Sequence, residues 1–183
     1  MLKKVLIGLG LLVVVLAVMI ALQPPTYRVN RTITISAPAS VVFDQVNDFH
    51  KWEGWSPWAK LDPAMKLTYE GPASGVGAKY EWSGNNDVGQ GRMTILESRP
   101  GDLVRIKLEF LKPIASVSDT EFSFKSEGNQ TAVVWSMAGE NDLMSKAMQV
   151  FVSMDKMVGG DFEKGLAAMK TVSEAAVAAP NKK

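Results

Sequence analysis

The sequence predicts an α+β fold: a curved antiparallel sheet of about seven strands wrapped on one long C-terminal helix, preceded by an N-terminal transmembrane helix. Three observations lead to this fold class. An uncharged apolar run occupies residues 5–22, apolar and charged residues alternate along most of 27–139, and apolar residues recur at helical spacing over 142–177.

The N-terminal apolar run is long enough to cross a bilayer. Its 18 consecutive residues carry no charge, and at 1.5 Å per residue they cover about 27 Å, close to the ~30 Å hydrocarbon thickness. A cleaved signal peptide is the alternative, because Lys3 and Lys4 form a basic leading segment. However, cleavage after Ala21 would place the bulky Met19 at the −3 position. We therefore predict an uncleaved anchor over residues 1–22.

The flanking cations predict the orientation of this anchor. Lys3, Lys4 and the terminal amine precede the span directly, whereas Arg28 and Arg31 follow it at a distance. Because the basic end of a span stays in the cytoplasm, we expect a single-pass protein with a cytoplasmic N-terminus. The rest of the chain would then lie on the periplasmic or other extracytoplasmic side of the membrane.

The part after the anchor begins with a linker and a strand. Gln23-Pro24-Pro25 predicts a short stiff linker over 23–26, since proline cannot continue the helix. The domain is expected over 27–177, with a flexible tail at 178–183. Its first strand covers 27–35, where apolar and polar residues alternate. A short helix around 41–46 and a helical turn at 48–53 should follow.

Six further strands and one helix complete the predicted domain. The strands are expected at 65–69, 79–82, 89–98, 104–110, 119–125 and 133–137, separated by glycine- and asparagine-containing turns. Their outward charges indicate a sheet with one wet face. A long helix over 142–177 should cover the other face, and Gly159-Gly160 is expected to bend or break it.

Composition excludes several classes of function. The chain has no cysteine, so disulfides, zinc–thiolate sites and thiol nucleophiles are ruled out. Without Lys3 and Lys4, 18 of the 20 basic residues remain against 19 acidic residues, so the domain is nearly neutral and we expect no nucleic-acid partner. The sequence contains no metal-binding constellation and no cofactor motif, and we predict neither metal nor cofactor. It does not predict an oligomeric state.

Several motifs in a fixed order resemble one superfamily. They are Ile33-Thr34-Ile35-Ser36-Ala37-Pro38-Ala39-Ser40-Val41-Val42-Phe43, Asn47-Asp48-Phe49, Trp52 with Trp55-Ser56-Pro57-Trp58, Gly91-Arg92-Met93, Phe110-Leu111-Lys112-Pro113, Trp135-Ser136-Met137-Ala138-Gly139 and Asp161-Phe162-Glu163-Lys164-Gly165-Leu166. The sequence resembles the SRPBCC/START-like helix-grip superfamily from about residue 28 to 173. It is most similar to the single-pass, membrane-anchored bacterial branch of the polyketide cyclase/dehydrase and lipid transport-like group. The resemblance implies a deep hydrophobic cavity between the sheet and the C-terminal helix.

Strand alternation and the resemblance together predict the residues that line or rim this cavity. They are Trp52, Trp55, Trp58, Tyr80, Trp82, Met93, Ile106, Leu108, Phe122, Trp135, Met137, Phe151 and Met154. The first three tryptophans allow three interpretations: a pocket rim, a patch in contact with the bilayer, or packing of the short helices against the sheet. We favour packing and keep all three as candidate ligand-binding residues.

No catalytic residue is predicted. His50 is the only histidine, and no nucleophile motif accompanies it, so we interpret it as a surface residue. Glu109 and Glu121 alternate with the inward set and should form charge pairs on the wet face. The leading hypothesis is a membrane-tethered, non-catalytic binding module for a lipid-like or other hydrophobic small molecule. The alternatives are a polyketide cyclase/dehydratase-like enzyme that uses a carboxylate, Tyr69 or Tyr80, and an envelope protein-interaction module.

Overall fold

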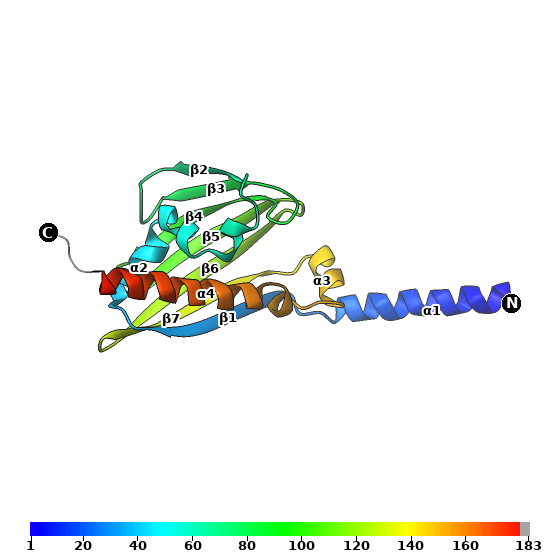
Figure 1. Ribbon diagram of the computed structural model, residues 1–183. Helices are drawn as coiled ribbons and strands as arrows, with labels where there is room; N and C mark the ends of the chain where they lie inside the picture. The colour runs from blue at the N-terminus through cyan, green and yellow to red at the C-terminus, as the bar shows by residue number, and fades with distance from the viewer. Residues whose placement is uncertain (180–183) are drawn as a thin grey trace.

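A computed structural model describes residues 1–179, and within that range it contains one seven-stranded antiparallel sheet, a long helix across the sheet and a separate N-terminal helix (Figure 1). The elements in chain order are α1 (Leu2–Ala21), β1 (Thr26–Ile35), α2 (Ala39–Asn47), the 3-10 helices η1 (Phe49–Gly54) and η2 (Pro57–Lys60), β2 (Lys66–Glu70), β3 (Lys79–Ser83), β4 (Gln90–Arg99), β5 (Leu103–Lys112), β6 (Ser116–Glu127), β7 (Gln130–Glu140), α3 (Leu143–Gln149) and α4 (Met154–Ala178). The predicted α+β class and every predicted strand are confirmed. Of the tail expected at 178–183, residues 180–183 lie outside the described residues.

The sheet is a meander closed by its first strand. Its order is β1-β7-β6-β5-β4-β3-β2, so β2 to β7 follow one another as antiparallel neighbours and β1 adds to the β7 edge. Each neighbouring pair of strands is antiparallel, and β4 carries a register shift between Ile95 and Glu97. The helices α2 and α4 lie on one face, which we call the inner face (Figure 1).

Residue alternation determines which side chains reach the inner face. On β6, Ser118, Thr120, Phe122 and Phe124 are buried, while the residues between them are exposed or half-buried. The opposite, outer face carries charge pairs, as predicted for Glu109. Its carboxylate accepts hydrogen bonds from the Arg92 guanidinium at 2.8 and 3.1 Å, and it lies 3.0 Å from the Lys107 amine.

The Glu109 cluster should make stability depend on pH. Hydrogen bonds from Arg92 and Lys107 lower the pKa of Glu109 from its usual 4.5 to about 2. Its contribution is therefore complete above pH 4.5 and is lost as the pH falls from about 4.5 to about 2. Glu109→Gln should lower the free energy of unfolding by about 1 kcal/mol at pH 7, with the difference vanishing through that acidic window.

This pH dependence can be measured by urea unfolding of the full chain in mild detergent at several pH values. Glu127→Gln is the matched control, because Glu127 pairs with Lys125 in the open, where the two side chains are 46% and 80% exposed. A Glu109→Gln difference that persists unchanged at pH 3 would contradict the assignment.

The short helices between β1 and β2 bury apolar residues against the sheet. Val42, Phe43 and Val46 of α2 are buried, and the Asp48 carboxylate accepts the His50 backbone N–H to cap η1. The predicted short helix and helical turn are both present. The 3-10 helix η2, which adds a further turn that begins at Pro57, was not predicted.

The helix was expected to bend or break at Gly159-Gly160, and the expected break is wrong. Helix α4 runs without interruption through both glycines, and the chain breaks earlier, between α3 and α4, at residues 150–153. Ser153 caps the start of α4, because its hydroxyl accepts a hydrogen bond from the Lys156 backbone N–H. Gly159 instead allows a close approach, because an added Cβ would collide with an Arg31 side-chain nitrogen. That guanidinium binds Asp155 and Glu163 of α4, both at 2.7 Å.

The N-terminal helix extends away from the domain (Figure 1). None of its 20 residues is buried, and among residues 1–179 it is the one helix long and apolar enough to cross a membrane. The linker after it is fixed to the domain by Asn141, which follows β7. The Asn141 backbone N–H and side-chain amide donate to the carbonyl oxygens of Pro25 and Pro24 at 2.8 and 3.0 Å.

Candidate functional site

The inner face is built from rows of side chains that the strand register places opposite one another. One row lies at the end of the sheet where β1 leaves the linker, and we call it the linker-side row. Its members are Tyr27, Gly139, Ser118, Leu108, Met93 and Tyr80. Three of the predicted wall residues therefore share one row, and it is apolar except for its hydroxyls.

A hydroxyl pair stands at one end of the linker-side row. The Tyr27 and Ser118 oxygens are 2.7 Å apart, and they bridge β1 and β6 across the strand β7 between them. This reach depends on Gly139, where an added Cβ would lie 2.7 Å from the Tyr27 hydroxyl oxygen. Local sequence patterns did not reveal the pair, because its members are 91 residues apart.

The next row carries a polar atom without a partner. Thr120 lies between Met137 of β7 and Ile106 of β5, and it is 3% exposed. Within residues 1–179 its hydroxyl has no hydrogen-bond partner, and the same is true of the Trp135 indole nitrogen. Buried polar atoms in folded proteins are nearly always satisfied, so each such atom needs an explanation.

A large open pocket adjoins the hydroxyl pair. Its volume is about 990 Å3, and its lining includes Tyr27, Ser118, Gly139, Asn141 and Ser145. The lining also contains consecutive strand residues, which point to opposite faces, so the pocket extends around the strand ends. It lies beside the linker and the start of α3, the part of the domain nearest to α1.

Most of the predicted aromatic wall residues pack against one another. Trp135 stacks on Phe162 with ring centroids 4.1 Å apart and on Phe122 at 4.8 Å, while Trp55 and Trp58 meet it edge-on. We call these five residues the aromatic stack. It fills the space between the centre of the sheet and α4 with protein side chains, so the deep cavity expected between the sheet and the C-terminal helix is not present at the centre of the sheet.

The tryptophans of the short helices have the packing role that we favoured. Trp52 and Trp55 are 4% and 2% exposed, and their indole N–H groups donate to the backbone carbonyls of Val46 and Gln45. Trp58 is half-buried on η2. Because Trp52 and Trp55 are buried, the three residues do not form an exposed patch for the bilayer or a protein partner.

One predicted wall residue, Phe151, differs from the rest. Phe151 does not face the interior: its side chain is 78% exposed, because the chain breaks between α3 and α4 and the helical spacing assumed for it does not continue. Met154, the first residue of α4, is partly buried against the core. Trp82 and Leu108 are likewise partly buried, and the Trp82 indole donates to the Val88 carbonyl.

Two tyrosines, Tyr69 and Tyr80, lie near the inner face. Burial raises the pKa of the Tyr80 phenol far above its usual range, and burial together with Glu53 raises the pKa of Tyr69. Both phenols therefore stay protonated near neutral pH and act as neutral hydrogen-bonding groups. His50 stacks on Tyr69 at 4.1 Å and lies 2.9 Å from Asp48, with about half of its side chain exposed.

Comparison with known proteins gives a family and a fold. A family model described as polyketide cyclase / dehydrase and lipid transport matches residues 26–174. No curated protein sequence matches the chain significantly.

Solved structures with low sequence identity share the fold. The Zhui aromatase/cyclase from Streptomyces sp. R1128 superposes with a TM-score of 0.64 at 14% identity, covering 85% of this chain and 98% of that one. The di-domain aromatase/cyclase StfQ of the steffimycin pathway gives 0.60 at 9% identity, over 84% and 52%. The Aha1 dimer from Colwellia psychrerythraea gives 0.54 at 14% identity, over 81% and 95%.

Proposed function

This chain belongs to the polyketide cyclase/dehydrase and lipid transport family, and from that premise we propose that it is a membrane-tethered module that binds a hydrophobic or lipid-like small molecule without chemical conversion. In this proposal α1 spans the bilayer with Lys3 and Lys4 on the cytoplasmic side, and the domain over 27–177 lies on the extracytoplasmic side.

The chemistry of the inner face supports an amphipathic ligand. Leu108, Met93 and Met137 are apolar side chains of the inner face; both methionines are buried and Leu108 is partly buried, and polarisable methionine side chains adapt to varied shapes. At one end of this surface stand the hydroxyls of Tyr27 and Ser118, next to the large pocket. An apolar body along the linker-side row with a polar group at these hydroxyls would satisfy both kinds of surface.

The state of the phenols supports binding rather than catalysis. A general base needs a pKa near the working pH so that it can accept a proton. Burial raises the pKa of Tyr80 and so moves it further from neutral pH. The Glu109 carboxylate lies on the outer face, where it binds Arg92. These groups are suited to orienting a ligand through hydrogen bonds.

The observation that carries the proposal is the buried, unpaired hydroxyl of Thr120, one row behind the Tyr27–Ser118 pair. Leaving such a group without a partner costs about 1–3 kcal/mol. A ligand that fills the linker-side row would bring a polar group within its reach. The unpaired Thr120 hydroxyl would then destabilise the ligand-free domain, and ligand binding would remove this destabilisation.

Thr120→Val should therefore have opposite effects on the stability of the domain and on ligand binding. The variant keeps the side-chain shape but removes the unpaired hydroxyl, so the free energy of unfolding should rise by about 1 kcal/mol while ligand occupancy falls. Thr131→Val is the matched control, because the equally buried Thr131 hydroxyl donates to the Ala37 carbonyl at 2.7 Å. That control should lose about 1 kcal/mol of stability and keep its ligand.

Native mass spectrometry of the full chain, released from nanodiscs made with its own membranes, measures the occupancy. We expect a bound mass that organic extraction identifies as a hydrophobic or lipid-like molecule. The fraction of this bound form should decrease in Thr120→Val and stay unchanged in Thr131→Val. A chain that is reproducibly empty would overturn the proposed function.

A further inference from the structure

We propose that α3 and the turn into α4 lie in the interfacial layer of the bilayer beside α1 and form a second membrane contact of the domain. We call residues 143–152 the α3 segment. This inference rests on the membrane tethering proposed above and adds a contact that the anchor alone does not require.

The α3 segment exposes apolar side chains that the domain does not cover. No residue of α3 is buried, although every other α-helix of the domain buries residues against the sheet. Leu143 is 75% exposed and Phe151 78%. The large apolar side chains exposed in and around the segment are Leu22, Leu143, Met144, Met148, Phe151, Val152 and Met157.

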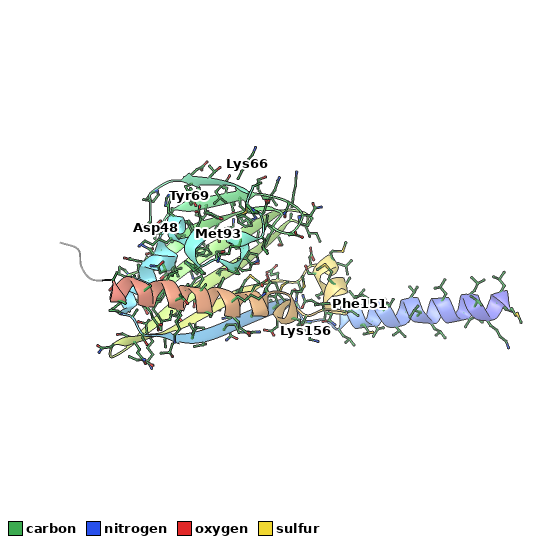
Figure 2. The ribbon with its side chains drawn as sticks, viewed as in Figure 1. Asp48, Lys66, Tyr69, Met93, Phe151 and Lys156 are labelled. Carbon is green, nitrogen blue, oxygen red and sulfur yellow. The ribbon has the colours of Figure 1, made fainter. Side chains whose placement is uncertain are left out.

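The position of the segment identifies the bilayer as the surface that covers it. Helix α3 contacts α1, and Phe151 lies at the α1 end of the domain (Figure 2). Asn141 holds this arrangement: it donates to the linker carbonyls of Pro24 and Pro25, and its own side-chain oxygen accepts from Gln149 at the end of α3. The segment therefore cannot move far from the point where α1 leaves the hydrocarbon.

Two lysines in and after the segment suit the headgroup layer. Lys146 is its one charged residue, and Lys156 follows on the first turn of α4 (Figure 2). Long basic side chains bury their methylenes in the apolar boundary while the amine reaches the lipid phosphates. Asp155 is compensated by Arg31, whose guanidinium nitrogens lie 2.7 and 3.1 Å from its oxygens. An interfacial helix combines apolar side chains and lysines in this way.

A membrane contact at α3 would also set the orientation of the binding site. The large pocket includes Pro25 of the linker together with Asp142 and Ser145 at the start of α3. With the α3 segment in the headgroup layer, the mouth of this pocket and the Tyr27–Ser118 pair face the bilayer. A lipid-like ligand would then enter or leave the domain without crossing water.

Site-directed spin labelling of the full chain in phosphatidylcholine/phosphatidylglycerol vesicles tests the proposal. The chain has no cysteine, so each introduced cysteine carries the only label. Phe151→Cys and Met148→Cys report on the α3 segment, Val13→Cys on the middle of α1, and Lys125→Cys on β6, where the side chain is 80% exposed. Collisions with oxygen, which concentrates in bilayers, are compared with collisions with a water-soluble nickel chelate.

We expect the labels at positions 13, 148 and 151 to favour oxygen and the label at 125 to favour the nickel chelate. If 148 and 151 favour the nickel chelate while 13 favours oxygen, the α3 contact is overturned and the tether stands. If 148 and 151 are shielded from both reagents, a protein surface covers them and the proposal is wrong. If position 13 favours the nickel chelate, both the tether and the α3 contact fail.

Discussion

Trp135→Ala is expected to lower the free energy of unfolding by about 3–5 kcal/mol, the usual cost of truncating a buried tryptophan. Trp135 is 2% exposed and touches four aromatic rings, among them Phe162 of α4 and Phe122 of β6. Its removal would leave a cavity at the point where the sheet contacts the C-terminal helix. Urea unfolding of the full chain in mild detergent, followed by circular dichroism, measures the loss.

Trp135→Phe is the control for this experiment. Phenylalanine keeps a ring between Phe122 and Phe162 and removes an indole N–H that has no partner in the described part of the chain. We therefore expect a loss smaller than that of the alanine variant by about 2 kcal/mol or more. A loss below about 1 kcal/mol for Trp135→Ala would mean that the aromatic stack is loosely packed, which would contradict a filled centre.

The strands were predictable from the sequence because their pattern is local. The alternation of Val104, Ile106 and Leu108 with charged residues has the two-residue period that a half-wet sheet requires. It also placed Glu109 on the outer face, where it pairs with Arg92. A period of two assigns each side chain to a face, and in an antiparallel meander neighbouring strands follow in sequence.

The site was only partly predictable because its polar contacts join distant segments. Tyr27 reaches Ser118, and Asn141 holds Pro24 and Pro25, across separations of 91 and more than 100 residues. No local period reports such pairs. Phe151 was likewise wrongly assigned to the interior, because helical spacing was counted without interruption over residues 142–177. The helix in fact stops after α3 and starts again at α4, which Ser153 caps.

The roles of the glycines in α4 also depend on contacts with residues that are distant in the sequence. Gly165→Ala is the second substitution for which we expect a large effect. A Cβ at Gly165 would lie 2.8 Å from a Trp135 ring carbon and 3.1 Å from Pro57, both held by the packing around the aromatic stack. Gly165→Ala should therefore force α4 away from the sheet and lower the free energy of unfolding by about 1–3 kcal/mol, the usual cost of overpacking. Urea unfolding of the full chain in mild detergent measures this loss.

Gly160→Ala in the same helix is the matched control with the opposite expected sign. An added Cβ there meets no atom within 4 Å, so the substitution adds helix propensity without a clash. It should raise the free energy of unfolding by about 0.5–1 kcal/mol. If both variants were stabilised, α4 would not be seated on Trp135. Opposite signs would show that packing requires a glycine at position 165 but not at position 160. The spacing of the two glycines along the helix does not reveal this difference.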